Sequence, residues 1–315
     1  MHIRIGTRQS ALALWQANFV AARLREAGHE VELIKISTSG DTIALPLGQA
    51  GGTGLFTKEI QHALLDHRCD VAVHSLKDLP TQPISGLSLA AVPTREDPRD
   101  CLVANEYQSI DQLPIGCVVG TGSPRRRAQL MHLRSDLEIR DIRGNVDTRL
   151  SKLKAGDYDA IVLATAGLNR LGLAHAISTP LSLETMLPAV GQGALGLETR
   201  AEDTESQRAL QILDDPVSHV CVRAEREVLR LLQAGCLAPV ASHASIVGDM
   251  LVLRAKVFSA DASTMISTTV RHQVLINEDS RKDQTPEALA RYASEKLVSQ
   301  GADQLISPID DPTDR

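Results

Sequence analysis

The stretch HIRIGTRQSALALWQANFVAARLREAGHEVELIKIS, residues 2–37, decides the fold class of this chain. His2–Thr7 alternates as a strand does, Ser10 can cap the helix that follows, and Gly28 is a natural stop for that helix. Val31–Ser37 then has the pattern of a second strand. A strand, a helix and a strand in this order form a βαβ unit, which is typical of a mostly parallel sheet.

The same order continues along the first two thirds of the chain. The expected strands are Asp70–His74, Leu87–Val92, Cys117–Gly120, Glu138–Ile142 and Asp159–Ala164, and Thr57–Arg68 is an expected helix. The turn-rich PTREDPRD (93–100) is expected to cross into a second unit, and LPAVGQGALGLE (187–198) to return to the first. In the first helix we expect Leu12, Trp15, Phe19 and Leu24 to lie near one face.

After residue 214 the pattern changes. Two helices, Val217–Gln233 and Pro286–Gln300, enclose three strand-like runs, Ser242–Val247, Leu251–Phe258 and Met265–Val274. This order predicts a small α+β domain. We therefore expect an α/β protein with three domains, made of residues 1–95 plus 195–214, residues 96–194, and residues 215–315.

Composition narrows the class of protein. The 315 residues carry 33 Lys and Arg against 39 Asp and Glu, a net charge of −6, and only seven Trp, Tyr and Phe. An acidic chain with few aromatic side chains is a poor binder of nucleic acids or membrane surfaces. No apolar run approaches the roughly 20 residues of a membrane helix, and MHIRIGTRQS lacks the apolar centre of a signal peptide. We expect a cytoplasmic monomer.

Five scattered cysteines without a CxxC motif are typical of reduced thiols rather than of disulfides or a metal site. Cys236 differs from the other four, because it lies on the Gly/Pro loop QAGCLAP (233–239), whereas they fall in or beside predicted elements and are expected to be buried. A loop cysteine near arginines can be a reactive thiolate. A structural role for Cys236 is the alternative.

Arginines follow three of the predicted strands, at turns that lead into helices. Arg8 follows the first strand, and GTGSPRRR (120–127) and RGNVDTR (143–149) repeat the arrangement. Ligands of open α/β sheets bind beyond the carboxyl ends of the strands, where helix N-termini and guanidinium groups hold anions. One such arginine alone would be a solvated charge or an ion-pair partner. Three similar turns together predict a site for a polyanion.

The loop HSLKDLP (74–80) also follows a strand directly, and it carries a hydroxyl, an ammonium and a carboxylate. A carboxylate among several cations stays ionised and can stabilise a developing positive charge. An ordinary surface pair of Lys77 and Asp78 is the alternative. GGTGLF (51–56) lacks both the GK[ST] ending and the GxGxxG spacing of nucleotide loops. It is expected to be a loop over a cleft or a simple turn.

These motifs together resemble the porphobilinogen deaminase family, also called hydroxymethylbilane synthases. The stretches that carry the resemblance are GTRQSALALWQ from Gly6, HSLKDLPT from His74, SPRRRAQL from Ser123, RGNVDTRLSKL from Arg143, YDAIVLATAGLNRLGL from Tyr158, LPAVGQGALGLE from Leu187 and AGCLAP from Ala234. They occur in the family's order and spacing, from about residue 3 to the last helix.

The resemblance implies two type II periplasmic-binding-protein-like α/β domains around a cleft, and a small domain that carries a cofactor cysteine. It implies a transferase of haem and tetrapyrrole biosynthesis. Such an enzyme condenses four porphobilinogen molecules head to tail onto a covalently bound dipyrromethane, releases ammonia each time, and hydrolyses off hydroxymethylbilane. The acetate and propionate arms of each pyrrole explain the need for arginines.

Carried over by position, the resemblance makes Asp78 the catalytic carboxylate and Cys236 the thioether attachment of dipyrromethane. The implied cofactor-binding residues are Ser75, Lys77, Thr121, Ser123, Arg125, Arg126 and Arg143. The implied substrate-binding residues are Arg8, Ser10, Phe56, Arg149, Arg170 and Gln192, with Gln192 at the hinge and Phe56 helping to close the site. No metal is implied. Thr53 departs from the family, since many relatives have Lys in its place.

Two other classes of function remain open from the residues alone. A non-catalytic binding module for a carboxylated or phosphorylated ligand would keep the arginine turns, but it would have no use for Cys236 or Asp78. A thiol hydrolase is disfavoured, because no histidine partner for Cys236 is evident in the sequence.

Overall fold

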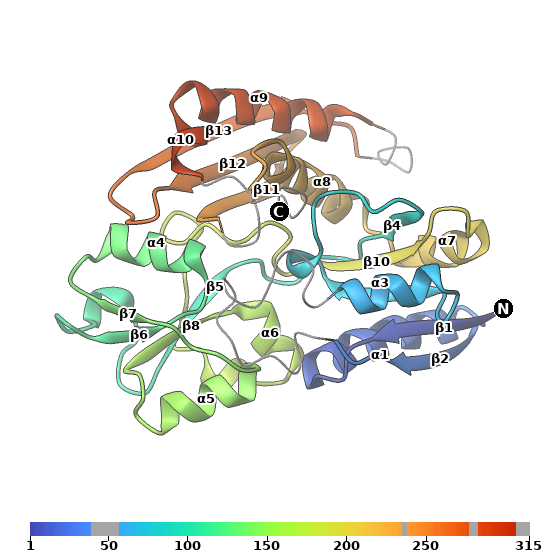
Figure 1. Ribbon diagram of the computed structural model, residues 1–315, viewed down its shortest axis with the longest axis horizontal. Coiled ribbons are helices and arrows are strands. Elements are labelled where there is room, and N and C mark those ends of the chain that lie inside the picture. The colour runs from blue at the N-terminus through green and yellow to red at the C-terminus, as the bar shows by residue number, and fades with distance from the viewer. Residues whose placement is uncertain (39–56, 235–237, 277–282, 307–315) are drawn as a thin grey trace, which may run out of the picture.

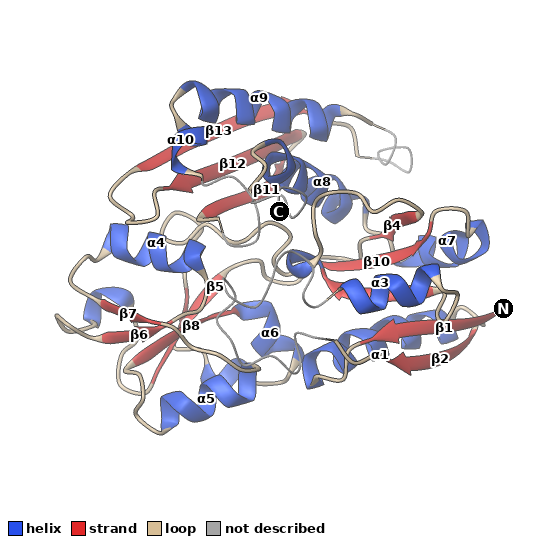
Figure 2. Ribbon diagram, viewed as in Figure 1, coloured by secondary structure: helices blue, strands red, loops and turns tan. Residues whose placement is uncertain are grey.

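The computed structural model describes residues 1–38, 57–234, 238–276 and 283–306. Their strands form three sheets, two of five strands and one of three. Figures 1 and 2 show the two larger sheets side by side, each with helices against it, and the small sheet with its own helices above them. The predicted fold class of two α/β domains and a small α+β domain is confirmed.

Domain 1 is built on a sheet with the order β2-β1-β3-β10-β4. Its strands are β1 (His2–Thr7), β2 (Glu30–Lys35), β3 (Val71–Ser75), β4 (Leu87–Ala91) and β10 (Leu195–Arg200), and its helices are α1 (Ala11–Glu26), α3 (Lys58–Leu65) and α7 (Thr204–Leu210). β1 is parallel to β2 and β3, whereas β10 is antiparallel to β3 and β4. The predicted return stretch therefore supplies the reversed strand of this sheet.

Domain 2 repeats this arrangement in the order β7-β6-β8-β5-β9. Its strands are β5 (Asp100–Ala104), β6 (Val118–Gly120), β7 (Glu138–Arg140), β8 (Ala160–Ala164) and β9 (Thr179–Pro180), and its helices are α4 (Pro124–Leu133), α5 (Val146–Lys154) and α6 (Thr165–Arg170). β5 is antiparallel to β8 and β9. In each domain, the first strand that the chain forms after it crosses from the other domain runs antiparallel to its neighbours. This strand is β10 in domain 1 and β5 in domain 2.

Trp15 and Phe19 share a face of α1, as predicted, but this is not the buried face, and Leu24 is the one member of the predicted set that is fully buried. The residues of α1 that are buried are Gln16, Ala17, Val20, Ala21 and Leu24. Small alanines allow the helix to lie close to the sheet, so they occupy the inner face and the large aromatic residues do not. Trp15 is 38% exposed, and its ring stacks on that of Phe19 at a centroid distance of 5.7 Å.

Domain 3 is a three-stranded antiparallel sheet covered by helices. Its strands are β11 (Val240–Val247), β12 (Met250–Phe258) and β13 (Met265–Gln273), and its helices are α8 (Pro216–Leu231), α9 (Thr285–Ser299) and α10 (Ala302–Leu305). α8 begins one residue before the predicted Val217, because Asp215 caps it and Pro216 occupies its first turn. Within the described ranges, no helix has both the length and the apolarity needed to cross a bilayer.

Two crossings connect domains 1 and 2, and they lie in contact. The backbone N–H of Glu96 on the first crossing donates to the carbonyl of Gly193 on the second, at 3.2 Å. Gly193 has a φ of +85°, and a Cβ at this position would collide with the carbonyl oxygen of Glu96. A residue with a side chain is therefore excluded from this place.

Glu225 of α8 fixes domain 3 to both crossings. Its carboxylate is fully buried and accepts hydrogen bonds from Arg95 at 2.6 and 3.1 Å. It also accepts from the backbone N–H groups of Gly191 at 2.7 Å and Ala244 at 2.8 Å. These partners belong to the first crossing, the second crossing and the sheet of domain 3. One carboxylate thus joins all three parts of the fold.

Candidate active site

A cavity of about 70 Å³ lies where β1 and β3 end in domain 1. Four predicted site residues line it: Arg8, Ser10, Ser75 and Asp78. The rest of the lining consists of Leu12, Ala13, Gln16, Thr57, Ile60, Val73 and His74. The fold therefore brings together residues that two separate sequence motifs predicted.

The start of α1 holds the first of these motifs in place. The hydroxyl of Ser10 accepts a hydrogen bond from the backbone N–H of Ala13 at 3.4 Å, as an N-cap does. The buried Thr7 donates its own hydroxyl to the carbonyl of Ala13 at 3.2 Å. Because Ser10 only accepts in the cap, its hydroxyl hydrogen can still be donated to a ligand.

The second motif forms a short 3₁₀ turn, η1 (Leu76–Asp78), directly after β3. Leu76 and Leu79 are buried, and the backbone N–H of Leu76 donates to the carbonyl of Ala194 at 3.0 Å. These two leucines anchor the turn on both sides of Lys77 and Asp78, which are half-buried. The two leucines therefore hold the turn in place while Lys77 and Asp78 remain partly accessible.

Asp78 has a different environment from most acids of the chain. Among the described residues, none makes a hydrogen bond or ion pair with its carboxylate at the distances typical of such contacts. Its neighbour Ser75 is held instead by Gln16, whose Nε2 donates to the serine hydroxyl at 2.8 Å. The carboxylate of Asp78 can therefore accept hydrogen bonds from a ligand in the cavity.

Asp100 is the centre of a second, buried part of the site, in domain 2. Its carboxylate accepts from Nη2 of Arg126 at 2.7 Å, and Nη1 of Arg125 lies 2.8 Å from its other oxygen. All three side chains are buried. Burial alone would raise the pKa of Asp100, but the two guanidinium groups outweigh it and hold that pKa well below its usual range. The pair Arg125 and Arg126 is thus fixed by one ionised carboxylate.

Gln192 connects this cluster with Lys77. Its Nε2 donates to Asp100 at 2.9 Å and to the carbonyl of Pro98 at 2.8 Å, and its Oε1 accepts from Nζ of Lys77 at 3.5 Å. Burial and the positive charge of Arg126 lower the pKa of Lys77 to about 8, although the charges of Asp78 and Asp100 oppose this. The second crossing therefore links Lys77, on the loop after β3 in domain 1, to the arginines of domain 2.

Arg143 and Arg149 extend the positive charge. Burial, together with the charges of Arg126 and Arg143, lowers the pKa of Arg149 to about 10, and the charge of Asp78 opposes this. Nε of Arg149 donates to the carbonyl of Gly144 at 2.8 Å. Since the fields of Arg126, Arg143 and Asp78 all reach Arg149, these residues lie around one region between the domains.

Thr121 and Ser123 hold the start of α4 at the end of β6. The buried hydroxyl of Thr121 accepts from the backbone N–H of Ser123 at 3.2 Å, and the hydroxyl of Ser123 accepts from that of Arg126 at 3.4 Å. Pro124 occupies the first turn. The structure places both hydroxyls beside Arg126 but outside the lining of the 70 Å³ cavity.

Arg170 lies at the contact between the domains rather than in that cavity. Its Nη2 donates to the carbonyl of Gly193 at 2.6 Å, and its guanidinium lies over the ring of Trp15 at 5.8 Å. Burial lowers its pKa to about 10, opposed by Glu96. In this conformation Arg170 therefore joins α1 of domain 1, α6 of domain 2 and the second crossing.

Two predicted site residues, Phe56 and Cys236, lie outside the described residues, as does Thr53. The four described cysteines, Cys69, Cys101, Cys117 and Cys221, are buried free thiols, as predicted. Burial raises the pKa of the first three to about 11 and that of Cys221 to about 12. None of these four is a thiolate at neutral pH, so none is suited to be a nucleophile.

Sequence reasoning missed several residues of the site. Gln16 is 2% exposed. It lies four positions before the buried Val20 and therefore on the same face of the helix, and this spacing was a possible signal for its burial. Asp100 was assigned to the turn-rich crossing, whereas it is the first residue of β5. Nothing in PTREDPRD distinguishes this aspartate from the other acids. His74 lies 3.2 Å from the buried Glu198 while also lining the cavity.

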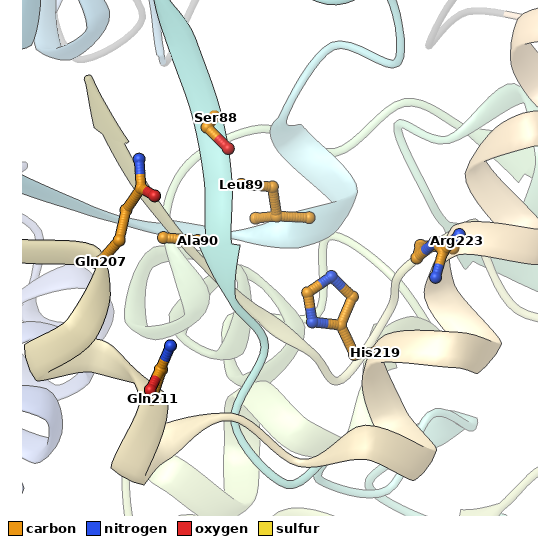
Figure 3. A pocket seen from close by; sticks show the side chains of 7 residues that line it. All are labelled: Ser88, Leu89, Ala90, Gln207, Gln211, His219 and Arg223. Atoms are coloured by element: carbon orange, nitrogen blue, oxygen red, sulfur yellow. The ribbon is translucent and has the colours of Figure 1, made fainter. Parts of the chain in front are cut away.

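A larger cavity of about 430 Å³ lies elsewhere, between β4, α7 and α8 (Figure 3). It is lined by Ser88, Leu89, Ala90, Gln207, Gln211, His219 and Arg223, and it contains none of the predicted site residues. Arg223 there forms an ion pair with Glu287 at 2.8 Å, and His219 one with Asp214 at 2.7 Å. The 70 Å³ cavity is therefore the better candidate in spite of its size.

In the described ranges, no group of three or more His, Cys, Asp or Glu side chains is placed to hold a metal ion.

Two family models match the chain. Residues 3–208 match "Porphobilinogen deaminase, dipyromethane cofactor binding domain", and residues 219–298 match "Porphobilinogen deaminase, C-terminal domain".

Several solved structures are similar to the chain at low identity. A nutrient-binding protein from Burkholderia cenocepacia bound to methionine is 15% identical, with 66% of this chain and 89% of that chain covered and a TM-score of 0.43. A lipoprotein of the YaeC family from Enterococcus faecalis is 15% identical, with coverages of 67% and 90% and a TM-score of 0.39. The periplasmic VFT2 domain of BvgS from Bordetella pertussis is 17% identical, with coverages of 66% and 85% and a TM-score of 0.39.

Proposed function

The chain belongs to the porphobilinogen deaminase family, and on that premise we propose how its residues carry out the reaction. The protein condenses four porphobilinogen molecules head to tail onto a covalently bound dipyrromethane, releases ammonia at each addition, and hydrolyses off hydroxymethylbilane. It is thus a transferase of haem biosynthesis, and porphobilinogen is its substrate.

The excess of buried positive charge supports the binding of a group with several carboxylates. Arg125 and Arg126 share a single carboxylate, that of Asp100, and Lys77 adds a third positive charge close to them. Nε of Arg125 is buried, and no described residue accepts a hydrogen bond from it. Burial also lowers the pKa of Arg125, opposed by Asp100. An anionic ligand would supply the missing partner, and this unbalanced charge is the observation that carries the proposal.

Dipyrromethane fits these residues, since its two pyrroles carry acetate and propionate arms. We assign its attachment to the sulfur of Cys236, and its arms to the donors around Asp100 and at the ends of β3 and β6. These donors are Ser75, Lys77, Thr121, Ser123, Arg125, Arg126 and Arg143. When bound, this cofactor supplies the pyrrole carbon to which the first porphobilinogen is joined.

Asp78 is assigned to the chemical step. As the aminomethyl group of porphobilinogen loses ammonia, positive charge develops on the substrate and spreads to the pyrrole nitrogen. A carboxylate with no partner among the described residues can accept the pyrrole N–H and stabilise that charge. Arg149 and Lys77 lie close enough to Asp78 for its charge to raise the pKa of each of them.

The remaining predicted residues are assigned to the substrate. Arg8 and Ser10 line the same cavity as Asp78 and can hold a carboxylate arm there. Arg149, Arg170, Gln192 and Phe56 complete the predicted set. Arg170 and Gln192 both stabilise the second crossing, and they would contact the substrate from there.

We also propose the finer features of the protein's organisation. The domain boundaries are those expected from the sequence, residues 1–95 plus 195–214, 96–194 and 215–315, and the sheets described above agree with them in their strand membership. The net charge of −6 supports a protein without nucleic-acid partners. The four free thiols among the described cysteines support a reducing compartment, the cytoplasm. We propose that the chain acts as a monomer.

Intact-mass measurement tests the proposed function. The purified chain should be heavier than its sequence by one dipyrromethane, and the Cys236→Ser variant should have the mass of the sequence alone. Cys69→Ser is the matched control, because that thiol is buried, and it should keep the added mass. Adding porphobilinogen should then produce a ladder of discrete masses on the parent chain. An unmodified parent that binds porphobilinogen without consuming it would refute the proposal.

A further inference from the structure

Thr57 is a buried residue of the cavity that the assigned reaction does not use. It is 1% exposed, it lines the 70 Å³ cavity together with Asp78, Arg8 and Ser10, and its hydroxyl oxygen has no hydrogen-bond partner among the described residues. A buried hydroxyl without a partner is destabilising, so proteins rarely retain one without a use for it.

The position of Thr57 in the chain makes its missing partner more informative. Thr57 precedes α3 as the N-cap residue, yet its side chain does not cap the helix. A threonine at this position normally accepts a hydrogen bond from one of the first backbone N–H groups of its helix. Ser10, Ser123 and Asn145 do so at the starts of α1, α4 and α5. The hydroxyl of Thr57 is therefore not engaged by its own helix, and the residue lines the cavity.

The size and lining of the cavity limit what it can hold. A single water needs about 10–15 Å³ of such a space, so a cavity of about 70 Å³ admits a few heavy atoms, as in a carboxylate arm. Leu12, Ile60 and Val73 give it apolar walls. Its polar lining includes the donors Arg8, Ser10 and Ser75, which suit an anion. Asp78 is an acceptor and suits a pyrrole N–H.

We propose that the hydroxyl of Thr57 donates a hydrogen bond to one carboxylate arm of porphobilinogen, held in this cavity together with Arg8 and Ser10. This inference rests on the proposed function, and it adds a substrate-binding residue that the sequence did not indicate. A hydroxyl kept without a partner in the protein alone gains one when substrate binds. Thr57 therefore contributes to substrate affinity at the expense of stability.

The Thr57→Val variant separates these two effects, because valine has nearly the same shape and lacks the hydroxyl. In the holoenzyme, we expect the KM for porphobilinogen to rise about tenfold, while kcat changes by less than about twofold, since a hydrogen bond to a charged group is lost. The Tm of the same variant should rise by about 1–3 °C, because an unpaired buried hydroxyl is removed. Thr57→Ser keeps the hydroxyl and should keep the parent KM.

Ser242→Ala is the matched control. Ser242 lies on β11 in domain 3, fully buried, and its hydroxyl also has no hydrogen-bond partner within the described ranges. This variant should raise Tm in the same way and leave KM unchanged. Two substrate analogues, each lacking one of the two carboxylates, give a second test. For one of them, used as a substrate or as a competitive inhibitor, Thr57→Val should no longer weaken binding.

Each other result overturns the inference. An unchanged KM in Thr57→Val would show that the hydroxyl does not contact substrate. A fall in kcat at constant KM would show that Thr57 acts on Asp78 and not on a carboxylate arm. A loss of affinity that persists with both analogues would exclude the arms as its partner. If the parent chain itself consumes no porphobilinogen, the proposed function fails and the inference fails with it, whereas the first three results leave the proposed function intact.

Discussion

Asp78 and Asp100 are the two acids of the site, and their surroundings are opposite. Asp100 is completely buried, and Arg125, Arg126 and Gln192 bind both of its oxygens. Asp78 is half-buried and lines a cavity, and no described residue binds its carboxylate. The two side chains have the same chemistry and lie close enough for both to affect Lys77.

The difference assigns separate tasks to the two acids. A carboxylate that already has three partners is not free to interact with the charge that develops on a substrate. It can, however, hold in place the arginines assigned to the carboxylate arms of the ligand. A carboxylate without partners can respond to the charge that develops on the substrate. This contrast supports the proposal that Asp78 is the catalytic acid and that Asp100 positions the arginines.

Replacement of Asp78 is expected to have the largest effect on turnover. Asp78→Ala should lower kcat by at least about 10³-fold, because it removes the group that stabilises the developing cation. Asp78→Asn should be nearly as slow, since the amide has a similar shape but no charge. Steady-state consumption of porphobilinogen measures both.

The fold should not depend on Asp78, because no described residue binds it. Both variants should have the parent's Tm to within about 2 °C. Asp157→Ala, a change of an exposed acid after α5, should leave turnover and Tm unchanged. If Asp78→Ala kept the parent's turnover, Asp78 would have no catalytic role, and the proposed difference between Asp78 and Asp100 would be wrong.

Replacement of Asp100 is expected to affect stability first. Asp100→Asn leaves Arg125 and Arg126 buried without their counter-charge, which should lower the free energy of unfolding by about 3–5 kcal/mol. Urea unfolding, followed by circular dichroism, measures this change.

Asp97 on the same crossing provides the control for Asp100. It forms an ion pair with Arg99 at 2.6 Å, but the arginine side chain is 42% exposed. Asp97→Asn should therefore cost only about 0–1 kcal/mol. If the two variants lost equal stability, Asp100 would not be the anchor of the arginine pair.

The same two acids show what could be predicted from the sequence. Asp78 lies between buried leucines directly after a strand, so its local pattern was sufficient to place it at the edge of the sheet. Asp100 lies in PTREDPRD, where every acid has a similar local context. Its burial depends on the pairing of β5 with β8 and on Arg126, which is 26 positions further along the chain. Local patterns contain no information about such a contact.

Helix α1 shows the same limit at another scale. Its start, its cap at Ser10 and its end at Gly28 were predicted, because these signals are local. Its inner face was not, because the approach of the helix to the sheet through Ala17 and Ala21 depends on tertiary packing. Gln16 was missed for the same reason, although it holds Ser75 beside Asp78.

Lys77 lies between the two acids and gives the smallest but most specific test of the comparison. Its pKa in the folded chain is about 8, lowered from 10.5. Between these two pH values the unfolded chain binds more protons than the folded one, so stability should rise with pH from about 8 to about 10.5. Below pH 8 the folded chain carries the full cost of a buried ammonium. In the Cys236→Ser background, Lys77→Met should therefore be more stable than its parent by about 1–3 kcal/mol at pH 7.

This advantage should shrink as the pH rises through the same window, and urea unfolding at several pH values measures it. The exposed Lys154 on α5 is the control, and Lys154→Met should show no such pH dependence. A stability difference that stays constant from pH 7 to about 10.5 would contradict a lowered pKa at Lys77. Because the charge of Asp78 raises the pKa of Lys77, adding Asp78→Asn should move the lower limit of the window below pH 8. A window that stayed in place would mean that Asp78 does not act on Lys77, so that the two acids do not share one electrostatic site.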